Sequence, residues 1–584
     1  MSFSTVFPAA KWLSTYNKSL FSGDLIAGII TAILLIPQAM AYSALAGLPP
    51  QIGLYASIAA PIMYALFGSS RTLAVGPVAV ASLMVAYALG SIAEQGTASY
   101  LEAAILLSFM VGICFIGIAI LRLGVLTEFL SHPVMAGFTS AAAIMIAFSQ
   151  LTPFAGFDEK LLFADLLSIG SLISIPGRIN DLTLVLGIVC LCGLYLIRKH
   201  FAKFLEKLPI STSLATGIAK TGPLIVLVFS SLAIWIFDMN STYDVAVIGH
   251  IPAGLPELSV SSFNWSLVQE LAPSAILITI VSFIESVAIA KVLASKRRER
   301  LNITQEAWGL GFANIGSGFT GASPVCGGFS RSVVNFSAGA NTQLAAIITA
   351  LIIGATLTFF TPLFYNVPKT VLAAIILIAI LELVDLKGFL KNLRYDRADG
   401  VAEATTFLCV LFFGIETGLL AGIGISLTLH FWRSSRPHIA IVGQVGDSEH
   451  FRNVKRHKVK TYPHLLAIRI DESLFFANAG YLETYILNEV ANKPELSDIL
   501  LICSAVNAID ASALHTLEQL KSELDDSSVA LHFAEIKGPV MDRLQATSLF
   551  SSQNPPQVFL STHQAFKEIS AKGNPLLNDP EWSI

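Results

Sequence analysis

Charged residues are scarce in this chain. Only 13% of its 584 residues are Asp, Glu, Lys or Arg, whereas 54% are hydrophobic, and the mean hydropathy is +0.69. Soluble domains carry roughly 25% charged residues. A chain of this composition cannot bury its apolar surface in a water-soluble core, so we expect a lipid bilayer to surround much of it. The chain has no basic tail, and nothing in its charge indicates a nucleic-acid partner.

Patterns typical of enzymes and of ATP-driven carriers are also missing. The six cysteines show neither zinc-like spacing nor a disulfide framework. There is no Walker A lysine motif, nucleophile–base pair or metal-ligand spacing, so we expect a protein that is not an enzyme and needs no cofactor or metal. Gly309-x-Gly311 and Gly316-x-Gly318 resemble a nucleotide loop only superficially. Because no strand precedes these glycines, close helix packing is the better interpretation.

Long apolar stretches recur up to about residue 432. A helix needs roughly 20 apolar residues to cross the hydrocarbon of a bilayer. Clear and weaker stretches together give about fourteen segments, two of them too short to span alone. The clear ones are Leu25–Leu45, Ile52–Phe67, Leu101–Leu121, Phe129–Leu151, Leu182–Ile197, Leu224–Phe237, Pro273–Leu293, Leu344–Pro362, Val367–Val384, Val401–Phe413 and Thr417–Phe431. The weaker, glycine-rich ones are Val78–Leu89, Gln305–Phe319 and Ser330–Ala340.

Basic residues gather in alternate loops, which predicts the orientation in the membrane. Loops rich in Lys and Arg remain in the cytoplasm. The clusters comprise Arg198, Lys199, Lys203 and Lys207, then Lys291, Lys296, Arg297, Arg298 and Arg300, then Lys387, Lys391, Arg394 and Arg397, and finally Arg433 and Arg436. With an even number of spans, both termini are expected in the cytoplasm, and the expected location is the cell (inner) membrane.

The pattern changes after Pro437. Short apolar runs alternate with amphipathic ones, in the order strand, helix, strand, helix. Predicted strands are Leu465–Ile470, Ile499–Cys503 and Val529–Phe533, and predicted helices are Ala479–Ala491 and Ala511–Asp525. This order predicts a small soluble α/β domain on the cytoplasmic side. The expected domains are therefore a transmembrane transport domain over 1–437 and a cytoplasmic domain with a C-terminal tail over 438–584.

Two interrupted apolar segments occupy corresponding positions in the two halves of the membrane part. Irregular backbone at membrane depth is tolerated only where it lines a protected cavity. An extended run over 73–76 leads into Pro77, and a Pro/Gly run over 322–328 leads into a second helix start. Two half-helices whose N-termini meet would bind an anion through free amides and helix dipoles, with Arg331 adding charge. Ordinary Pro/Gly kinks are the alternative.

Two further spans carry candidate functional side chains. Glu285 is the only acid deep in the predicted span Ile276–Val292. Burial favours the protonated form of a carboxyl, so Glu285 is a candidate proton carrier, and a structural hydrogen bond is the alternative. Pro37 interrupts the first span beside Gln38 and Tyr42. Gln38 is a candidate to face a substrate, although a helix–helix hydrogen bond explains it equally well.

Several motifs carry a family resemblance. The longest are Gly23–Gly28, Ile36–Tyr42 and Gly47–Tyr55, and shorter ones are Ser70–Thr72, Gly76–Pro77, Phe283–Ser286 and Phe329–Ser332. Together they resemble the signature of the SulP sulfate-permease family, which includes bacterial anion transporters, plant sulfate transporters, and the animal carriers pendrin and prestin. The stretch from Ile441 to about Ala571 resembles the STAS domain of these proteins.

The resemblance implies a fold and a movement. The fold is an all-α membrane domain of fourteen segments in two inverted seven-segment repeats, about 20–237 and 270–433, followed by an α/β STAS domain. A core domain with two half-helices would carry the site and move like an elevator against a gate domain. A homodimer is also implied. The substrate contacts carried over from the family are Gln38, Tyr42, Ala74, Val75, Gly76, Val78, Ala79, Gly328, Phe329, Ser330 and Arg331.

The resemblance also bears on the coupling ion. The acid at Glu285 would couple transport to a cation. Sodium-coupled bicarbonate members tend to have Asp at this position and Thr one helical turn later, whereas this chain has Glu285 and Ile289. A co-transported proton is therefore expected, with sodium as the alternative.

The preferred hypothesis is proton-coupled uptake of a small oxyanion, with sulfate first and Ser330 as a side-chain donor. The alternatives are bicarbonate or a dicarboxylate such as succinate or fumarate, an uncoupled anion exchanger, and a membrane sensor whose STAS domain binds a cytoplasmic protein. Asp510-Ala511-Ser512 lies at the turn that is phosphorylated in STAS regulators. Ala511 departs from the usual pattern, so capping of a helix by Ser512 is favoured over regulation.

Overall fold

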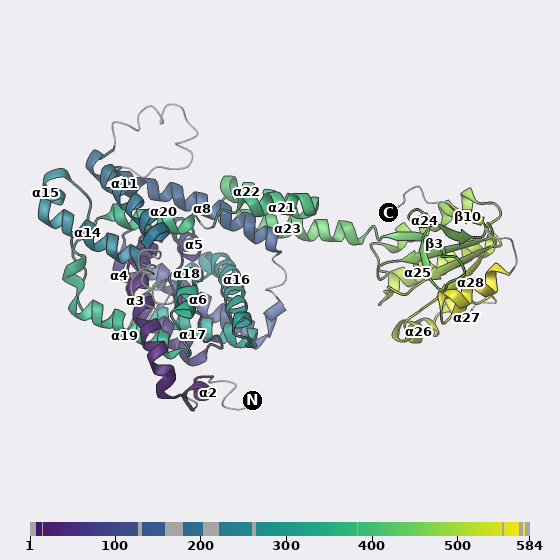
Figure 1. The fold of residues 1–584 in the computed structure, drawn as a ribbon, viewed down its shortest axis with the longest axis horizontal. Helices are drawn as coiled ribbons and strands as arrows, with labels where there is room; N and C mark the ends of the chain where they lie inside the picture. The colour runs from purple at the N-terminus through teal and green to yellow at the C-terminus, as the bar shows by residue number, and fades with distance from the viewer. Residues whose placement is uncertain are drawn as a thin grey trace. The chain divides into compact units, whose positions relative to one another are not determined.

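The computed structural model describes residues 8–14, 16–125, 131–157, 179–201, 221–259, 264–381, 383–551, 554–571 and 576–578. Lys203 and Lys207 of the first basic cluster lie outside these ranges. The chain divides into two compact units, Met1–Ser426 and Leu427–Ile584 (Figure 1). The first unit is almost entirely helical, and the second contains a large sheet.

Helices of the first unit occupy the apolar stretches of the sequence. In chain order they are α3 (Lys18–Leu45), α4 (Pro50–Phe67), α5 (Ala79–Gly90), α6 (Ala98–Ile120), α8 (His132–Ala155), α11 (Asp181–Leu196), α14 (Gly222–Phe237), α16 (Trp265–Lys296), α17 (Ile303–Phe319), α18 (Phe329–Ser337), α19 (Leu344–Phe359), α20 (Lys369–Ile380), α22 (Arg397–Phe413) and α23 (Ile415–Ser434), whose last residues belong to the second unit. The short helices α2 (Ala9–Ser14), α15 (Met239–Tyr243) and α21 (Leu386–Tyr395) and the turns η1 (Leu123–Val125), η3 (Ile197–Phe201) and η4 (Thr361–Phe364) complete the unit.

Many of these helices are suited to a bilayer. Among the described residues, 7 helices are long and apolar enough to cross a membrane by length and composition. They are α3, α4, α6, α8, α11 with its extension to Phe201, α16 and α23. The apolar helices α5, α14, α19 and α20 are shorter. The chain is thus a multi-pass membrane protein, and the count of fourteen segments stays a prediction.

Glycines allow α17 to pack closely against both α4 and α6. A Cβ atom added to Gly309 would lie 2.6 Å from the Cα of Gly68, at the end of α4. One added to Gly318 would lie 2.9 Å from the Phe109 ring on α6. Distances this short leave no room for a larger side chain. The interpretation of these glycines as packing positions is therefore confirmed.

The second unit contains an 8-stranded sheet with the order β10-β5-β3-β6-β7-β8-β9, to which β4 adds through β3. Its strands are β3 (Ile439–Gln444), β4 (Phe451–Asn453), β5 (Val459–Thr461), β6 (Leu465–Ile470), β7 (Asp498–Ile502), β8 (Ala530–Ala534), β9 (Gln557–Phe559) and β10 (Leu576–Asn578). Strands β6 to β9 are parallel, and β3 to β5 are antiparallel to their neighbours. The remaining helices are α24 (Ala479–Asn492), α25 (Ala511–Asp526), α26 (Gly538–Leu544), α27 (Ser548–Ser551) and α28 (Thr562–Ser570).

Both faces of this sheet are covered by helices. Leu482 of α24 and Leu517 of α25 belong to one apolar core, whereas Phe566 of α28 belongs to a core on other sheet side chains. Strands β6 to β8 and helices α24 and α25 confirm the predicted elements to within one residue at each end. The sequence of β7 contains a continuous apolar run because helices cover both faces of the sheet.

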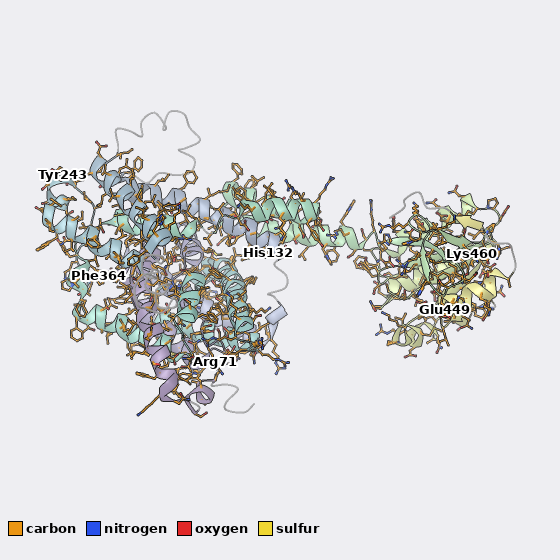
Figure 2. The ribbon with its side chains drawn as sticks, viewed as in Figure 1. Arg71, His132, Tyr243, Phe364, Glu449 and Lys460 are labelled. Atoms are coloured by element: carbon orange, nitrogen blue, oxygen red, sulfur yellow. The ribbon has the colours of Figure 1, made fainter. Side chains whose placement is uncertain are left out.

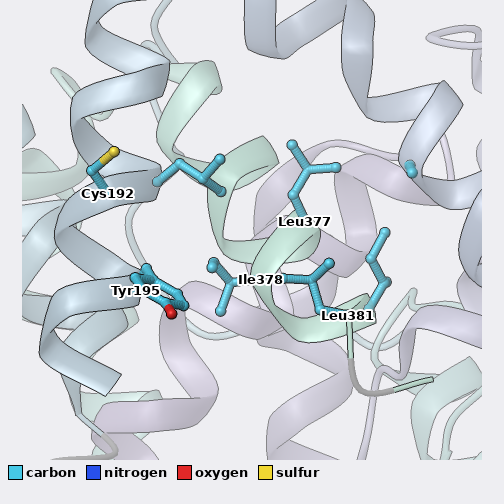
Figure 3. A pocket seen from close by; sticks show the side chains of 8 residues that line it. Cys192, Tyr195, Leu377, Ile378 and Leu381 are labelled. Atoms are coloured by element: carbon cyan, nitrogen blue, oxygen red, sulfur yellow. The ribbon is translucent and has the colours of Figure 1, made fainter. Parts of the chain in front are cut away.

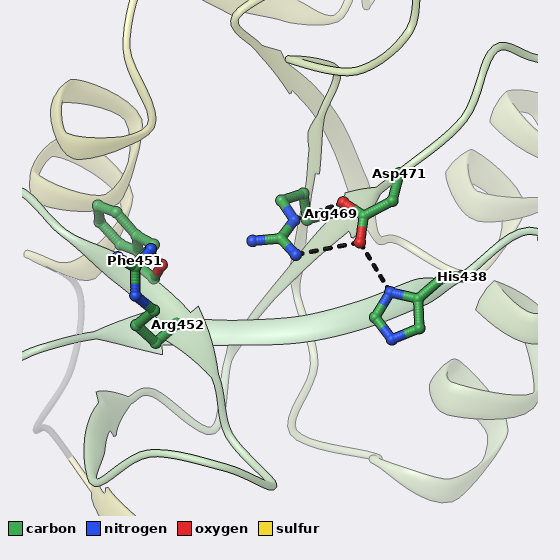
Figure 4. A network of polar contacts seen from close by, with 5 residues as sticks. All are labelled: His438, Phe451, Arg452, Arg469 and Asp471. Atoms are coloured by element: carbon green, nitrogen blue, oxygen red, sulfur yellow. Dashed lines mark hydrogen bonds and ion pairs between the residues drawn. The ribbon is translucent and has the colours of Figure 1, made fainter. Parts of the chain in front are cut away.

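A polar network joins the first strand of this unit to the end of β6 (Figure 4). The Nε and Nη2 atoms of Arg469 donate to the two oxygens of Asp471 at 2.6 and 3.0 Å, and His438 Nδ1 lies 2.7 Å from Asp471 Oδ2. Burial raises the pKa of Asp471, but the hydrogen bonds from Arg469 and His438 outweigh it and hold this pKa below the usual value for Asp. The contact between His438 and Asp471 thus links the residue before β3 to the residue after β6.

Candidate functional site

The two interrupted segments predicted from the sequence meet in space. Their extended parts, β1 (Val75–Gly76) and β2 (Cys326–Gly327), pair as antiparallel strands with Val75 opposite Gly327. The Gly328 amide adds a hydrogen bond of 3.0 Å to the Ala74 carbonyl. The pairing satisfies backbone groups that would otherwise be buried without partners in the middle of a membrane domain. Segments from opposite halves of the chain therefore form one element.

A helix begins directly after each of these strands. Val78 precedes α5 and Gly328 precedes α18, and neither residue caps its helix through a side chain. Ala74, Val75, Gly76, Val78, Ala79 and Gly328 are all buried. The first amides of a helix have no partner within the helix and carry its positive dipole end. Two such ends follow one strand pair, so this region offers an anion several donors without side-chain competition.

Arg331 extends from α18 toward the start of α5. Its side chain is 1% exposed, and its Nη1 donates to the Pro77 carbonyl at 2.6 Å. Its Nε and Nη2 are buried and have no partner among the described residues. A Cβ on Gly328 would lie 2.7 Å from Nη2, so glycine at this position leaves room for the guanidinium. Buried charged donors without partners are costly, and a bound anion would satisfy them.

Three side chains lie within range of an electrostatic interaction with this guanidinium: Tyr42 of α3, Glu285 of α16, and Cys326 of β2. Glu285 is half-buried, and among the described residues it forms neither a hydrogen bond nor a direct ion pair with Arg331. Its neighbour Ser286 accepts a hydrogen bond of 2.8 Å from the Gly327 amide. The acid therefore lies near the cation and beside the strand pair, without being fixed by a partner.

The remaining predicted contacts differ in their surroundings. Gln38 and Tyr42 are buried on α3, which packs against both half-helices. Tyr42 lies near Arg331 and Glu285, whereas the Gln38 side chain forms no hydrogen bond with another described residue. Phe329 and Ser330 are exposed on the first turn of α18. The structure thus brings Tyr42, Glu285 and Arg331 together around the strand pair.

Several polar residues that hold the strand pair were missed by the sequence reasoning. Asn314 of α17 both donates to and accepts from the backbone of Val325, at 2.9 Å in each case. Ser332 accepts a hydrogen bond of 2.9 Å from the Ala74 amide, and Asn335 donates to the Thr72 carbonyl at 3.1 Å. All three side chains are buried. Their only signal in the sequence is polarity within segments that are otherwise apolar.

A second buried acid, Glu306 of α17, was also missed. It is fully buried and accepts hydrogen bonds from the Tyr64 hydroxyl at 2.5 Å, from the Ser69 amide and hydroxyl at 2.9 and 2.5 Å, and from the Ser70 amide at 2.8 Å. Arg71, which follows Ser70 and is labelled in Figure 2, forms an ion pair of 3.4 Å with Glu299. These contacts fix the loop that leads into β1.

In the second unit, the prediction that Ser512 caps α25 is wrong. Asp510 occupies the cap position, and its Oδ1 accepts a hydrogen bond of 2.8 Å from the Ala513 amide. The reason is spacing, because a capping side chain reaches the amide two or three residues ahead, and Ser512 already lies inside the first turn. Asp510 also accepts from the Phe476 amide at 2.9 Å. Ser512 is exposed, and its regulatory role stays a prediction.

Among the described residues, no group of three or more His, Cys, Asp or Glu side chains could hold a metal ion.

Comparison with protein families gives two matches. The Sulfate permease family matches residues 21–406, and the STAS domain matches residues 456–565. Sulfate transporter 4.1, chloroplastic, of Arabidopsis thaliana is 38% identical over 540 residues, which cover 90% of this chain and 77% of that protein. High affinity sulfate transporter 2 of Stylosanthes hamata is 31% identical over 582 residues, which cover 97% of this chain and 87% of that protein.

Solved structures share the fold. The overall structure of SLC26A9 aligns with a TM-score of 0.86 at 21% identity, over 97% of this chain and 93% of that one. The transmembrane domain of a cyanobacterium bicarbonate transporter, BicA, aligns with a TM-score of 0.58 at 23% identity, over 70% of this chain and 99% of that one. These likenesses concern the fold, and they confirm a helical membrane domain joined to a STAS domain.

Proposed function

Because the chain belongs to the sulfate permease family, and is therefore a transporter of anions rather than an enzyme, we propose that it carries sulfate together with a proton. The observation that carries the proposal is the buried Arg331, which lies beside two helix N-termini. Its Nε and Nη2 have no partner among the described residues. The relatives at 30% to 38% identity are named as sulfate transporters, which favours sulfate among small anions.

Anion binding follows from the donors in this region. Oxygens of a bound sulfate would accept hydrogen bonds from the first amides of α5 and α18 and from the free guanidinium nitrogens of Arg331. These donors are fixed in advance, because β1, β2 and the Pro77 carbonyl hold the backbone and Nη1 in place. Ser330, on the first turn of α18, is the candidate side-chain donor. Little reorganisation would then accompany binding.

Glu285 would link a proton to this anion. An ionised Glu285 partly cancels the potential of Arg331, and a bound divalent anion would repel it. Sulfate binding therefore favours protonation of Glu285, and protonation in turn strengthens sulfate binding by the same factor. The half-buried position of Glu285 supports this role, because a proton carrier needs a route to solvent. An inward proton gradient would then drive accumulation.

An elevator-like movement would carry the site across the membrane. Ser286 of α16, Asn314 of α17 and Ser332 of α18 each hydrogen-bond to the strand pair or its flanks. Glu285 and Arg331 would thus travel with α5 and α18 as one body, which supports a moving core domain. The proposal also includes domain limits of 1–437 and 438–584, a homodimer, and a cytoplasmic partner of the STAS domain. It places the protein in the cell (inner) membrane with both termini in the cytoplasm.

Uptake of radiolabelled sulfate into proteoliposomes tests the substrate. Because helix ends and a guanidinium recognise negative charge in general, unlabelled bicarbonate, succinate and fumarate are added in parallel. Sulfate uptake that none of these anions reduces strongly would support the proposal. Uptake of one competitor without sulfate would move the substrate to that anion. If no anion is taken up, the alternative of a membrane sensor gains support.

A further inference from the structure

An apolar groove lies between α11 and α20 (Figure 3). Its volume is about 350 Å³, and the surface that lines it is entirely apolar. Leu191, Cys192 and Tyr195 come from α11, Leu377 and Ile378 from α20, and Ala147 from α8. Cys192 and Tyr195 are exposed. A groove of this kind would hold a hydrocarbon chain rather than a polar ligand.

Two cations lie at one end of the groove. The last turn of the α11 segment, η3, carries Arg198 and Lys199, both exposed. The Lys199 ammonium lies 5.6 Å from the centroid of the Tyr195 ring, and Arg198 Nη1 donates to the Ile378 carbonyl at 3.2 Å. Tyr195 and Ile378 both line the groove. Positive charge therefore adjoins the apolar surface directly.

The membrane explains why these two features occur together. Asp181–Phe201 is long and apolar enough to cross a bilayer, and only 22% of it is buried inside the protein. Basic side chains at the end of such a helix extend to the level of the lipid headgroups. Basic pockets between transmembrane helices recognise anionic headgroups. The groove would then lie beside the acyl chains of the lipid bound at the cations.

We propose that the groove and the basic turn form a binding site for one phospholipid with an anionic headgroup. An acyl chain would occupy the space between α11 and α20, and the phosphate would contact Arg198 and Lys199. Charge complementarity favours this occupant over a second copy of the chain. A two-fold contact at the groove would bring the basic turns of both copies to the same membrane surface.

Native mass spectrometry of the full-length protein tests the headgroup preference. Phosphatidylglycerol and phosphatidylcholine are supplied at equal concentration, and we expect phosphatidylglycerol to be retained preferentially. Arg198→Gln with Lys199→Gln should lower that preference by about fivefold for each charge removed. Lys291→Gln with Lys296→Gln removes two exposed charges from the end of α16 and should leave it unchanged. If the variant with both Arg198→Gln and Lys199→Gln does not fold, the preference is measured with Lys199→Gln alone.

Filling the groove tests the acyl-chain part separately. Cys192→Phe should reduce retention of both phospholipids and keep the ratio between them. Equal retention of the two lipids by the unmodified protein, or an equal loss of preference in both double variants, would overturn the proposal. Efficient cross-linking through Cys192 between two copies, absent in Cys192→Ser, would show instead that a second copy covers the groove.

Discussion

Two acids of the membrane domain, Glu306 and Glu285, lie in opposite environments. Glu306 is fully buried, and Tyr64, Ser69 and Ser70 satisfy its carboxylate with four hydrogen bonds. Glu285 is half-buried, accepts no hydrogen bond from a described residue, and lies within electrostatic reach of Arg331. An acid whose partners are complete is an anchor for the fold. One near a cation, without fixed partners among the described residues, is the better candidate for a proton carrier.

Arg331 resembles Glu285 in lacking partners among the described residues for part of its side chain. Its substitution is expected to have the largest effect on transport. Arg331→Gln keeps a polar side chain but removes the cation that lies beside the two helix ends. Sulfate uptake should fall by roughly 100-fold or more, as expected when a charged partner of a bound anion is lost. Arg331→Lys, which keeps the charge but loses the planar fork, should retain part of the activity. Initial rates in proteoliposomes measure both, and a normal rate for Arg331→Gln would contradict the assigned site.

Glu306 should matter for stability. Glu306→Ala removes the acceptor of several buried donors, and the expected loss is about 3 kcal/mol or more. Thermal unfolding of the purified protein measures the effect. Glu285→Gln is the matched variant in the neighbouring helix and should leave the melting temperature nearly unchanged. The comparison fails if Glu285→Gln destabilises the protein as much as Glu306→Ala.

A smaller effect is expected at Ser286, which contacts the strand pair beside Glu285. Ser286→Ala leaves the Gly327 amide without its acceptor, a loss of about 1–3 kcal/mol. Because β2 leads into α18, the KM for sulfate should rise severalfold. Thr279→Ala in the same helix is the control, since the Thr279 hydroxyl donates to the Ala275 carbonyl of its own helix. An equal change of KM in both variants would argue against a positioning role for Ser286.

The smallest effect concerns the start of α25. Asp510→Ala removes a helix cap and should cost about 1 kcal/mol, whereas Ser512→Ala should change the free energy of unfolding by less than about 0.5 kcal/mol. Hydrogen exchange of the α25 amides in the full-length protein follows local opening. Faster exchange in Ser512→Ala than in Asp510→Ala would restore Ser512 as the cap.

Local sequence patterns predicted much of this fold. Apolar length predicted the membrane helices, and the Pro/Gly runs predicted the extended segments that became β1 and β2. Short apolar runs between amphipathic ones predicted β6 to β8. Hydrogen bonds between distant residues had no local signal: Glu306 binds a loop more than 230 positions away, and Asn314 was indistinguishable from any polar residue in a glycine-rich helix. The short antiparallel strands β4 and β5 were missed because three-residue strands give too little alternation to detect.

Proton coupling through Glu285 is the central claim, and one measurement tests it most directly. Radiolabelled sulfate uptake is followed in proteoliposomes with and without an inward proton gradient, for the unmodified protein and for Glu285→Gln. We expect the gradient to drive accumulation by the unmodified protein only, while Glu285→Gln equilibrates sulfate without responding to the gradient. Normal gradient-driven accumulation by Glu285→Gln would contradict the account.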